Sequence, residues 1–392
     1  MKNTSPSLVR LLLSSAALLA LAAPVAAKKP APAPDSASVD AKKEALVQLA
    51  ILLDTSNSMD GLIEQAKSQL WKIVNEFNDA KQDGKVPVVQ VALYEYGNSG
   101  LSVAGNYIRQ VLPFTRDLDR VSEELFKLTT NGGDEYCGAV LQHALDSLEW
   151  KANPKVYKAV FIAGNEPFTQ GPIEPNSVCR SAIARGVVVN TIHCGHQADG
   201  ENGGWRTGAA LAEGRFLTIN QDRAIVHVPA PQDDAITKLS IELNNTYIRY
   251  GKDGMRGCAN QTAQDSNATA LKEAGAAVQR ALTKASANYK NSTWDLVDAC
   301  KKDGVKLGSI DKETLPKELQ ALSEEEVQKV INEKATQREQ IQAEIKKLNQ
   351  ERETFLAQQR KEKAQDLTLD EAISTAVREQ AASKAGIAFQ NP

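Results

Sequence analysis

The stretch that most constrains this chain is Leu46–Met59, with the sequence LVQLAILLDTSNSM. Its apolar run is short, partly β-branched and free of Pro and Gly, a pattern typical of a strand buried on both faces. The run ends in Asp54-x-Ser56-x-Ser58, so one carboxylate and two hydroxyls follow directly from the strand. Open α/β sheets bind their ligands at the carboxyl ends of the strands. We therefore expect a ligand site at this loop.

The residues after this strand alternate between strand-like and helix-like patterns. The predicted strands are 46–53, 86–94, 107–112, 157–163, 187–193 and 216–219, and the predicted helices are 61–80, 117–128, 136–148, 176–185, 205–213 and 232–247. Strands separated by helices imply crossover connections and a mostly parallel sheet. Residues 44–251 are therefore predicted to form one doubly wound α/β domain, which the helix at 232–247 closes.

The loop at Asp54, Ser56 and Ser58 offers three hard oxygen ligands. Such a set suits Mg²⁺, Mn²⁺ or Ca²⁺, whereas zinc prefers His and Cys. Because the loop supplies so little negative charge, a bound cation keeps an unsatisfied positive field. An acidic group from a protein partner would complete its coordination shell.

The segment 52–59, LLDTSNSM, resembles the metal-ion-dependent adhesion site of the von Willebrand factor type A (VWA) family. The order of strands and helices over residues 44–250 is also similar to that family's fold. The resemblance implies a Rossmann-like sheet, a bound divalent cation, with Mg²⁺ as the first candidate, and recognition of a protein partner. It further implies a bacterial exported protein that binds its partner rather than transforming it.

Two further loops of the family contribute to this site. In the second loop, Asp134 of Asn131-Gly-Gly-Asp-Glu135 stands where the family has a Thr or an acid, so the resemblance implies Asp134 as a metal ligand and Glu135 as a possible ligand or outer contact. The alternative role of Asp134 is to cap the following helix. The family's third loop carries an Asp, but this chain has Gly164-Asn165-Glu166. Asn165 or Glu166 is expected to supply an oxygen there, and a degenerate site that binds no metal is the alternative.

A second chemistry is conceivable at the same edge of the sheet. His193, Cys194 and His196 follow a predicted strand, and with Cys137 and Cys179 they offer ligands for zinc or copper. Their spacing matches no standard zinc pattern. Cys137 at a helix N-terminus is also a conceivable reactive thiol, although no partner base is evident.

The first residues have the pattern of an export signal. A weakly positive start, an apolar stretch at 11–23 and the small residues Val25-Ala26-Ala27 predict a cleavable signal peptide over residues 1–27. The Ala-, Pro- and Lys-rich segment 28–43 is predicted to be an extended linker. We therefore expect a periplasmic or secreted protein, with no transmembrane anchor in the mature chain.

The five cysteines allow disulfides in such a compartment. Cys258 and Cys300 are the first candidate pair, since both lie in the C-terminal part of the chain, and Cys179 and Cys194 are the second. The odd number leaves at least one thiol unpaired or joined to another molecule.

Residues 252–392 show no strand-like run and are predicted to be helical. The main feature is a long charged helix at about 323–364, opened by a capping box of Ser323 and Glu326. Its apolar residues follow one seven-residue register, but the partner positions are polar, which weakens a coiled coil. The stripe is predicted to pack against a neighbouring helix, and self-association is the alternative.

Composition and motifs together favour a binding protein over an enzyme. The net charge of −3 gives no support for nucleic-acid binding. No nucleophile with an oriented base is evident, so we predict no enzymatic activity. Two alternatives stay open: a metal-assisted hydrolase with Glu135 or Glu166 as base, and a scaffold whose metal site is vestigial.

Overall fold

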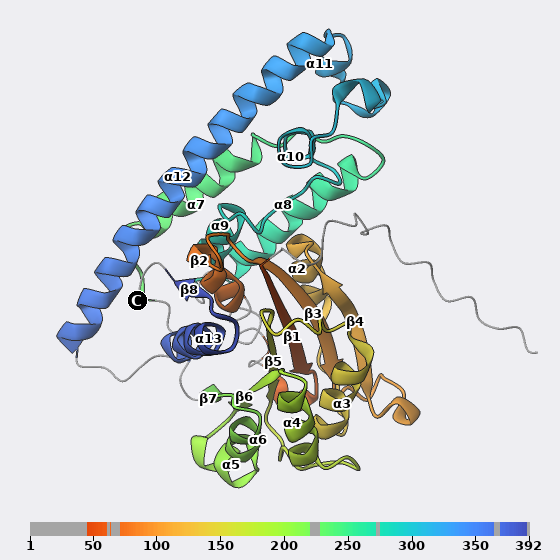
Figure 1. Ribbon diagram of the computed structural model, residues 1–392, viewed down its shortest axis with the longest axis vertical. Coiled ribbons are helices and arrows are strands. Elements are labelled where there is room, and N and C mark those ends of the chain that lie inside the picture. The colour runs from red at the N-terminus through yellow and green to blue at the C-terminus, as the bar shows by residue number, and fades with distance from the viewer. Residues whose placement is uncertain are drawn as a thin grey trace, which may run out of the picture. The chain divides into compact units, whose positions relative to one another are not determined.

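A six-stranded sheet lies at the centre of the computed structural model, which describes residues 45–60, 63, 71–219, 228–271, 275–363 and 369–389 (Figure 1). The order of strands across the sheet is β4-β3-β1-β5-β6-β7, and every neighbouring pair is parallel except β3 and β4. The predicted doubly wound, mostly parallel sheet is confirmed. The strands are β1 (Leu46–Asp54), β3 (Val88–Tyr96), β4 (Ile108–Thr115), β5 (Tyr157–Gly164), β6 (Val188–Cys194) and β7 (Phe216–Ile219).

Strand β1 occupies the middle of the sheet, and all nine of its residues are buried. Because successive side chains of a strand point to opposite faces, β1 contributes to two separate cores. Burying a Leu or Ile side chain contributes about 1.5–3 kcal/mol, so this strand is firmly held. One core receives Val47, Leu49, Ile51 and Leu53, and the other receives Ala50 and Leu52.

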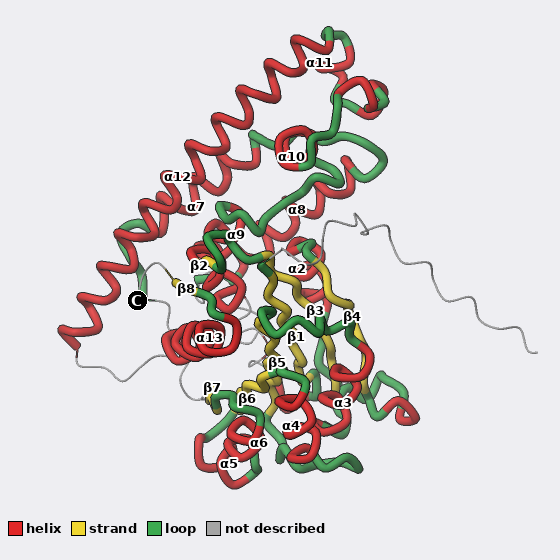
Figure 2. Tube along the Cα trace, viewed as in Figure 1, coloured by secondary structure: helices red, strands yellow, loops and turns green. Residues whose placement is uncertain are grey.

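Helices cover both faces of the sheet, as Figure 2 shows in red around the yellow strands. The core that contains Leu52 is closed by α3, α4 and α6, with the short α5 beside β6. The core that contains Leu49 is closed by α2, by helical and 3-10 residues at 71–79, and by α13. The bounds are α2 (Leu118–Lys127), α3 (Cys137–Ser147), α4 (Pro175–Ala184), α5 (Gln197–Asn202), α6 (Trp205–Leu211) and α13 (Leu369–Ala385).

Helix α13 comes from the far end of the chain, yet it belongs to the sheet domain. Its apolar side chains Ile373 and Val377 are fully buried in the same core as β1. Its Gln380 accepts a hydrogen bond from the Tyr157 hydroxyl of β5 at 2.8 Å and donates one to the Asn190 side chain of β6 at 2.7 Å. Beyond α13, β8 (Ala388–Phe389) pairs antiparallel with β2 (Ala80–Lys81).

The helical part of the chain is therefore inserted between β7 and α13. Helix α7 (Asp233–Asn244), which we expected to close the sheet domain, instead packs on α9 and α12 in a core of its own. The expectation fails because an apolar stripe on a helix does not specify which surface it covers. The domain boundary that we placed at residue 251, between the sheet domain and the helical region, stays a prediction. The remaining helices are α8 (Gly254–Ala270), α9 (Ala276–Lys284), α10 (Leu296–Lys302), α11 (Lys317–Gln320) and α12 (Glu324–Lys363).

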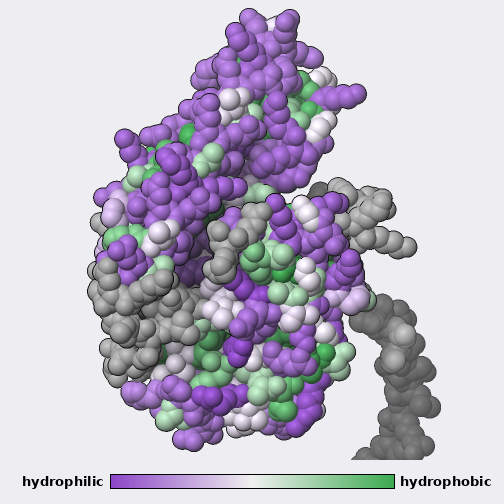
Figure 3. Space-filling view, turned by 60° about the vertical axis from the view of Figure 1, so that its left-hand side comes forward, coloured by the Kyte–Doolittle hydropathy of each residue, from purple (hydrophilic) through white to green (hydrophobic). Residues whose placement is uncertain are grey.

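The long helix α12 begins at the predicted capping box. The Ser323 backbone amide donates to Glu326 Oε2 at 2.8 Å, and the Glu326 amide donates back to Ser323 Oγ at 3.3 Å. One face of α12 packs along α7, α9 and α10, so its apolar stripe is covered within the chain. The other face is charged, and the surface around α11 and the start of α12 is hydrophilic at the top of Figure 3.

Buried ion pairs hold the inserted helices together. Arg338 of α12 lies 2.8 Å from Asp295 and 2.8 Å from Asp298, and its guanidinium stacks on the Tyr247 ring at 4.0 Å. These charges are almost fully buried, so each depends on its partner to offset the cost of desolvation.

All five cysteines have free thiols, so neither predicted disulfide is formed. Cys179 lies in the core on one face of the sheet and Cys194 in the core on the other, which separates that pair. Among the described helices, none is both long and apolar enough to cross a membrane. The predicted signal peptide at 1–27 and the linker at 28–43 lie outside the described residues.

Short 3-10 segments complete the structure. One of them follows β1 directly and carries Ser58, and it therefore shapes the loop of interest. They lie at Asn57–Met59, Glu76–Asp79, Val103–Gly105, Leu307–Ser309 and Lys312–Thr314.

Candidate metal centre

The carboxyl ends of β1, β3 and β5 meet at one edge of the sheet. Asp54 at the end of β1 pairs with Tyr96 at the end of β3, and Leu53 pairs with Ala163 of β5. The loops that follow these strands therefore surround Asp54. This is the place where open α/β sheets bind ligands.

Asp54 is a buried carboxylate in which only one of the two oxygen atoms is hydrogen-bonded among the described residues. Its Oδ1 accepts from the Ser56 backbone amide at 2.8 Å, which holds the loop in a tight turn. Its Oδ2 is buried and has no hydrogen-bond partner among the described residues, and the residue as a whole is 0 % exposed. Burial raises the pKa of Asp54 to about 6, because the charged form is poorly solvated there. A buried orphan oxygen of this kind is costly unless a ligand satisfies it.

The two serines and Asn165 provide neutral oxygens beside this carboxylate. The hydroxyls of Ser56 and Ser58 lie 2.8 Å apart, and Ser58 Oγ donates to Asn165 Oδ1 at 3.0 Å. The third loop thus places the Asn165 amide oxygen beside Ser58, and its role as a metal ligand stays a prediction. The backbone carbonyl of Glu166 accepts from the Trp205 indole at 2.8 Å, and its carboxylate contributes negative charge near Asp54.

The acid that approaches Asp54 from the second loop is Glu135. The residue is 6 % exposed, and burial together with the charge of Asp54 raises the pKa of Glu135 to about 7. Asp134, which we predicted as a ligand, is exposed and accepts a hydrogen bond from the Tyr136 hydroxyl at 3.2 Å. Asp134 as a metal ligand stays a prediction, whereas the turn of the loop places the Glu135 side chain beside Asp54.

Two glycines leave room for this arrangement. A Cβ on Gly97 would lie 2.8 Å from both Asp54 Oδ1 and Glu135 Cγ, and its φ of +78° also favours glycine. A Cβ on Gly164 would lie 2.5 Å from the Tyr96 hydroxyl and 3.2 Å from Asp54 Cβ. There is no space for an acidic side chain at position 164. The absence of the expected third-loop Asp therefore has a steric reason.

These residues fit a hard divalent cation. An orphan carboxylate oxygen, two hydroxyls and an amide oxygen are ligands of the kind that Mg²⁺, Mn²⁺ and Ca²⁺ prefer. A bound cation would favour the charged forms of Asp54 and Glu135 and so offset the cost of burying them. Asp54, Ser56 and Ser58 would hold it, with Glu135 and Asn165 at its sides.

The structure gives no support for the alternative site of His and Cys ligands. Within the described ranges, no group of three or more His, Cys, Asp or Glu side chains is arranged to hold a metal ion. His193 instead packs against the Trp205 ring, with 5.7 Å between centroids, and Cys194 is buried in a core. Burial also raises the pKa of Cys137 far above the neutral range, which disfavours a reactive thiolate.

Sequence reasoning missed two residues of the site. Gly97 lets Asp54 and Glu135 approach each other, and Gln170 reaches Glu135 from the loop after β5. With its amide nitrogen toward the acid, Gln170 donates to Glu135 Oε2 and to its carbonyl, at 3.2 Å each. The glycine directly after a buried strand was a usable signal, whereas nothing in the sequence singles out Gln170.

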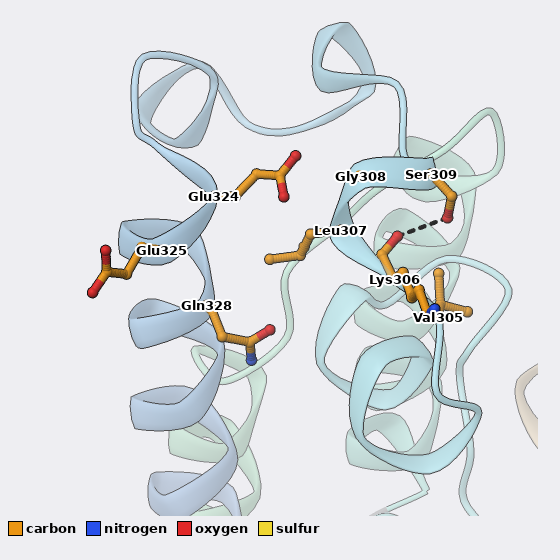
Figure 4. A pocket seen from close by; sticks show the side chains of 8 residues that line it. All are labelled: Val305, Lys306, Leu307, Gly308, Ser309, Glu324, Glu325 and Gln328. Carbon is orange, nitrogen blue, oxygen red and sulfur yellow. Dashed lines mark hydrogen bonds between the residues drawn. The ribbon is translucent and has the colours of Figure 1, made fainter.

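A separate hollow of about 730 Å³ lies in the inserted helices (Figure 4). Glu324 and Gln328 of α12 face it from one side, and Leu307 lies opposite. None of the residues around Asp54 lines it, so it is not part of the candidate metal centre.

The sheet, its strand order and the loop at Asp54 define a doubly wound α/β domain with a candidate cation site. The sequence model of the von Willebrand factor type A domain matches residues 48–212, so this part of the chain is a VWA domain. The match ends before β7 and includes neither the inserted helices nor α13. A comparison with curated proteins finds no match.

Several solved structures are similar to part of the chain at low identity. Proximal thread matrix protein 1 from the mussel byssus, in a form with a zinc-occupied MIDAS motif, is 18 % identical with a TM-score of 0.36; the match covers 46 % of this chain and 43 % of the mussel protein. The SpRpn10 VWA domain is 16 % identical with a TM-score of 0.35, covering 50 % of this chain and 95 % of that domain. BatB from Bacteroides thetaiotaomicron is 16 % identical with a TM-score of 0.34, covering 44 % and 90 %. This chain thus spans less than half the length of the mussel protein.

Proposed function

We propose that this chain is an exported binding protein that recognises a protein partner through a divalent cation held by Asp54, Ser56 and Ser58. The observation that carries this proposal is the buried Oδ2 of Asp54, which has no partner within the described residues and lies in a loop with two hydroxyls. A cation would satisfy that oxygen and bridge to an acidic group of the partner.

Mg²⁺ is the proposed ion, with Mn²⁺ and Ca²⁺ as close alternatives. The proposed ligands Asp54, Ser56 and Ser58 all supply oxygen atoms, which suit Mg²⁺ better than the softer Zn²⁺. Residues 1–27 support export to the periplasm or beyond, since their pattern is that of a signal peptide.

Thermal unfolding with and without cation tests the site. Wild-type protein in chelator, Mg²⁺, Mn²⁺, Ca²⁺ or Zn²⁺ is compared with Asp54→Asn and with Asp234→Asn, an exposed acid on α7. A cation at 1,000 times its Kd stabilises the folded state by about 4 kcal/mol. We expect a shift with Mg²⁺ and Mn²⁺ in wild type and in Asp234→Asn, and none in Asp54→Asn.

A pull-down from envelope extract then tests the role of the cation in binding. The bait is wild-type protein or Asp54→Asn, in Mg²⁺ and then in chelator. We expect a partner that is retained only by wild type in Mg²⁺. Retention of the same partner in chelator would contradict cation-mediated recognition. Metal-dependent turnover of phosphoesters or peptides that Asp54→Asn abolishes would point to a hydrolase instead.

A further inference from the structure

The position of Glu135 at the metal centre has a consequence for how a partner gains access. A Cβ added to Gly97 would meet Asp54 Oδ1 and Glu135 Cγ at the same distance of 2.8 Å, so both side chains crowd the same point of the backbone. Glu135 is also buried, and the charge of Asp54 helps to raise the pKa of its carboxyl group. The Glu135 side chain therefore lies buried beside Asp54 rather than exposed at the rim of the site.

The loop that carries Glu135 is fixed in place on both sides. The Ser99 amide donates to the Gly132 carbonyl at 2.5 Å, and the Asn131 amide donates to the Thr55 carbonyl at 3.0 Å. A Cβ on Gly133 would lie 2.2 Å from the Gly97 carbonyl oxygen, so the two loops are in direct contact. With its amide nitrogen toward the acid, Gln170 also donates to the Glu135 carboxylate. These contacts between the loops therefore hold the Glu135 side chain in its inward position.

The charges at the site complete the argument. Asp54 and Glu135 together match the charge of a divalent cation, and Glu166 adds negative charge that raises the pKa of both. A cation held by two carboxylates keeps little attraction for a third carboxylate from outside. The partner's acid and Glu135 then compete for the same ion.

We propose that Glu135 is an internal carboxylate cap, which occupies the coordination position that an acidic partner would use and so keeps the metal centre closed. This inference rests on the proposed function, because it requires a cation at Asp54. A partner's carboxylate enters only when the Glu135 side chain leaves the ion. Glu135 thus sets the threshold for binding, and its exposed neighbour Asp134 has no such effect.

Mn²⁺ as a probe tests this directly. Bound Mn²⁺ is counted by electron paramagnetic resonance, and its water ligands are measured by proton relaxation, in wild type, Glu135→Ala, Glu135→Gln and Asp134→Ala. We expect Glu135→Ala to weaken Mn²⁺ binding by roughly tenfold and to add a water ligand. Acetate should displace that water in Glu135→Ala and leave wild type and Asp134→Ala unchanged. Glu135→Gln keeps the shape of the side chain and should show the same changes to a smaller degree.

The outcomes separate the two proposals. Suppose that wild type binds Mn²⁺ through Asp54, but that Glu135→Ala and Glu135→Gln have the same Mn²⁺ affinity and number of water ligands as wild type and do not respond to acetate. The proposal that Glu135 caps the ion is then wrong, and the proposed cation site stands. If wild type binds no Mn²⁺, and Asp54→Asn behaves identically, both proposals are overturned.

Discussion

Arg280 Nη1 on α9 lies 2.6 Å from Asp119 Oδ1 on α2, and the two side chains are 2 % and 4 % exposed. The contact is an ion pair rather than an aligned hydrogen bond, and the Tyr289 hydroxyl donates to the other Asp119 oxygen at 2.7 Å. This pair joins the inserted helices to the sheet domain. Arg280 also lies 2.9 Å from Asp265, so only the removal of Arg280 leaves a desolvated charge, that of Asp119, without its opposite charge.

Breaking this ion pair should destabilise the whole chain. We expect Arg280→Met to lower the free energy of unfolding by about 3–5 kcal/mol, and Asp119→Asn to cost less because Arg280 keeps Asp265. Urea denaturation followed by circular dichroism measures the change. The matched control is Arg215→Met, whose ion pair with Glu379 is more than half exposed on both sides and should contribute no more than about 1 kcal/mol. Equal losses in Arg280→Met and Arg215→Met would contradict the argument.

Helix α13 should behave as part of the sheet domain. Ile373 is fully buried against the sheet, so Ile373→Ala should cost about 2–5 kcal/mol through lost burial and a cavity. Thr375→Ala, on the exposed face of the same helix, is the control and should change stability by less than about 0.5 kcal/mol. Hydrogen exchange should show loss of protection in β5 and β6 with Ile373→Ala. Unchanged protection in those strands would make α13 a detachable appendage.

Restoring an acid to the third loop should harm the protein rather than improve its metal site. Gly164→Asp places a Cβ 2.5 Å from the Tyr96 hydroxyl and 3.1 Å from the Trp205 ring, so neighbouring side chains must shift. We expect a loss of about 1–3 kcal/mol from overpacking, with no gain in Mg²⁺ affinity. Gly105→Ala, whose Cβ would meet only Ser102 Cβ at 3.8 Å, should be tolerated. Calorimetric titration measures the Mg²⁺ affinity, and a thermal melt measures the stability. Tighter Mg²⁺ binding in a stable Gly164→Asp variant would disprove the argument that position 164 has no space for an acid.

His193 should make stability fall below neutral pH. Burial lowers the pKa of this imidazole from its ordinary value of 6.5, so the unfolded chain takes up the proton first. Stability is therefore complete above pH 6.5 and declines as the pH falls below that value. The buried acids Asp54 and Glu135 act in the opposite direction, because their raised pKa values make stability fall as the pH rises.

Comparison with His193→Phe isolates the imidazole, since both proteins share all other titrating groups. The difference in unfolding free energy between the two should be constant from pH 7 to pH 8. Below pH 6.5, wild type should lose stability relative to His193→Phe. Denaturation at half-unit steps of pH measures it. A pH-independent difference would show that His193 has no shifted ionisation.

Sequence patterns determined the sheet, because the information they need is local. An apolar run such as Leu46–Leu53 specifies a buried strand, alternation of strands with helices specifies crossover connections, and the residues after the strand specify oxygen chemistry. The buried strand and the crossover connections are confirmed, and they needed no knowledge of long-range contacts; the oxygen site stays a prediction. The capping box at Ser323 succeeded for the same reason, since both of its residues lie within one helical turn.

Only the tertiary structure decided which residues meet. Asp134 and Glu135 are equivalent acids in the sequence, and the contact of the 131–133 loop with Gly97 and Ser99 turns Glu135 inward. Likewise α7 and α13 carry comparable apolar stripes, but α13 covers the sheet while α7 packs on α9 and α12. The hydrophobic effect has no direction, so an apolar stripe predicts that a helix face is buried but does not predict which surface buries it. That choice depends on the shapes of surfaces far apart in the chain, and so does the identity of the acid beside Asp54.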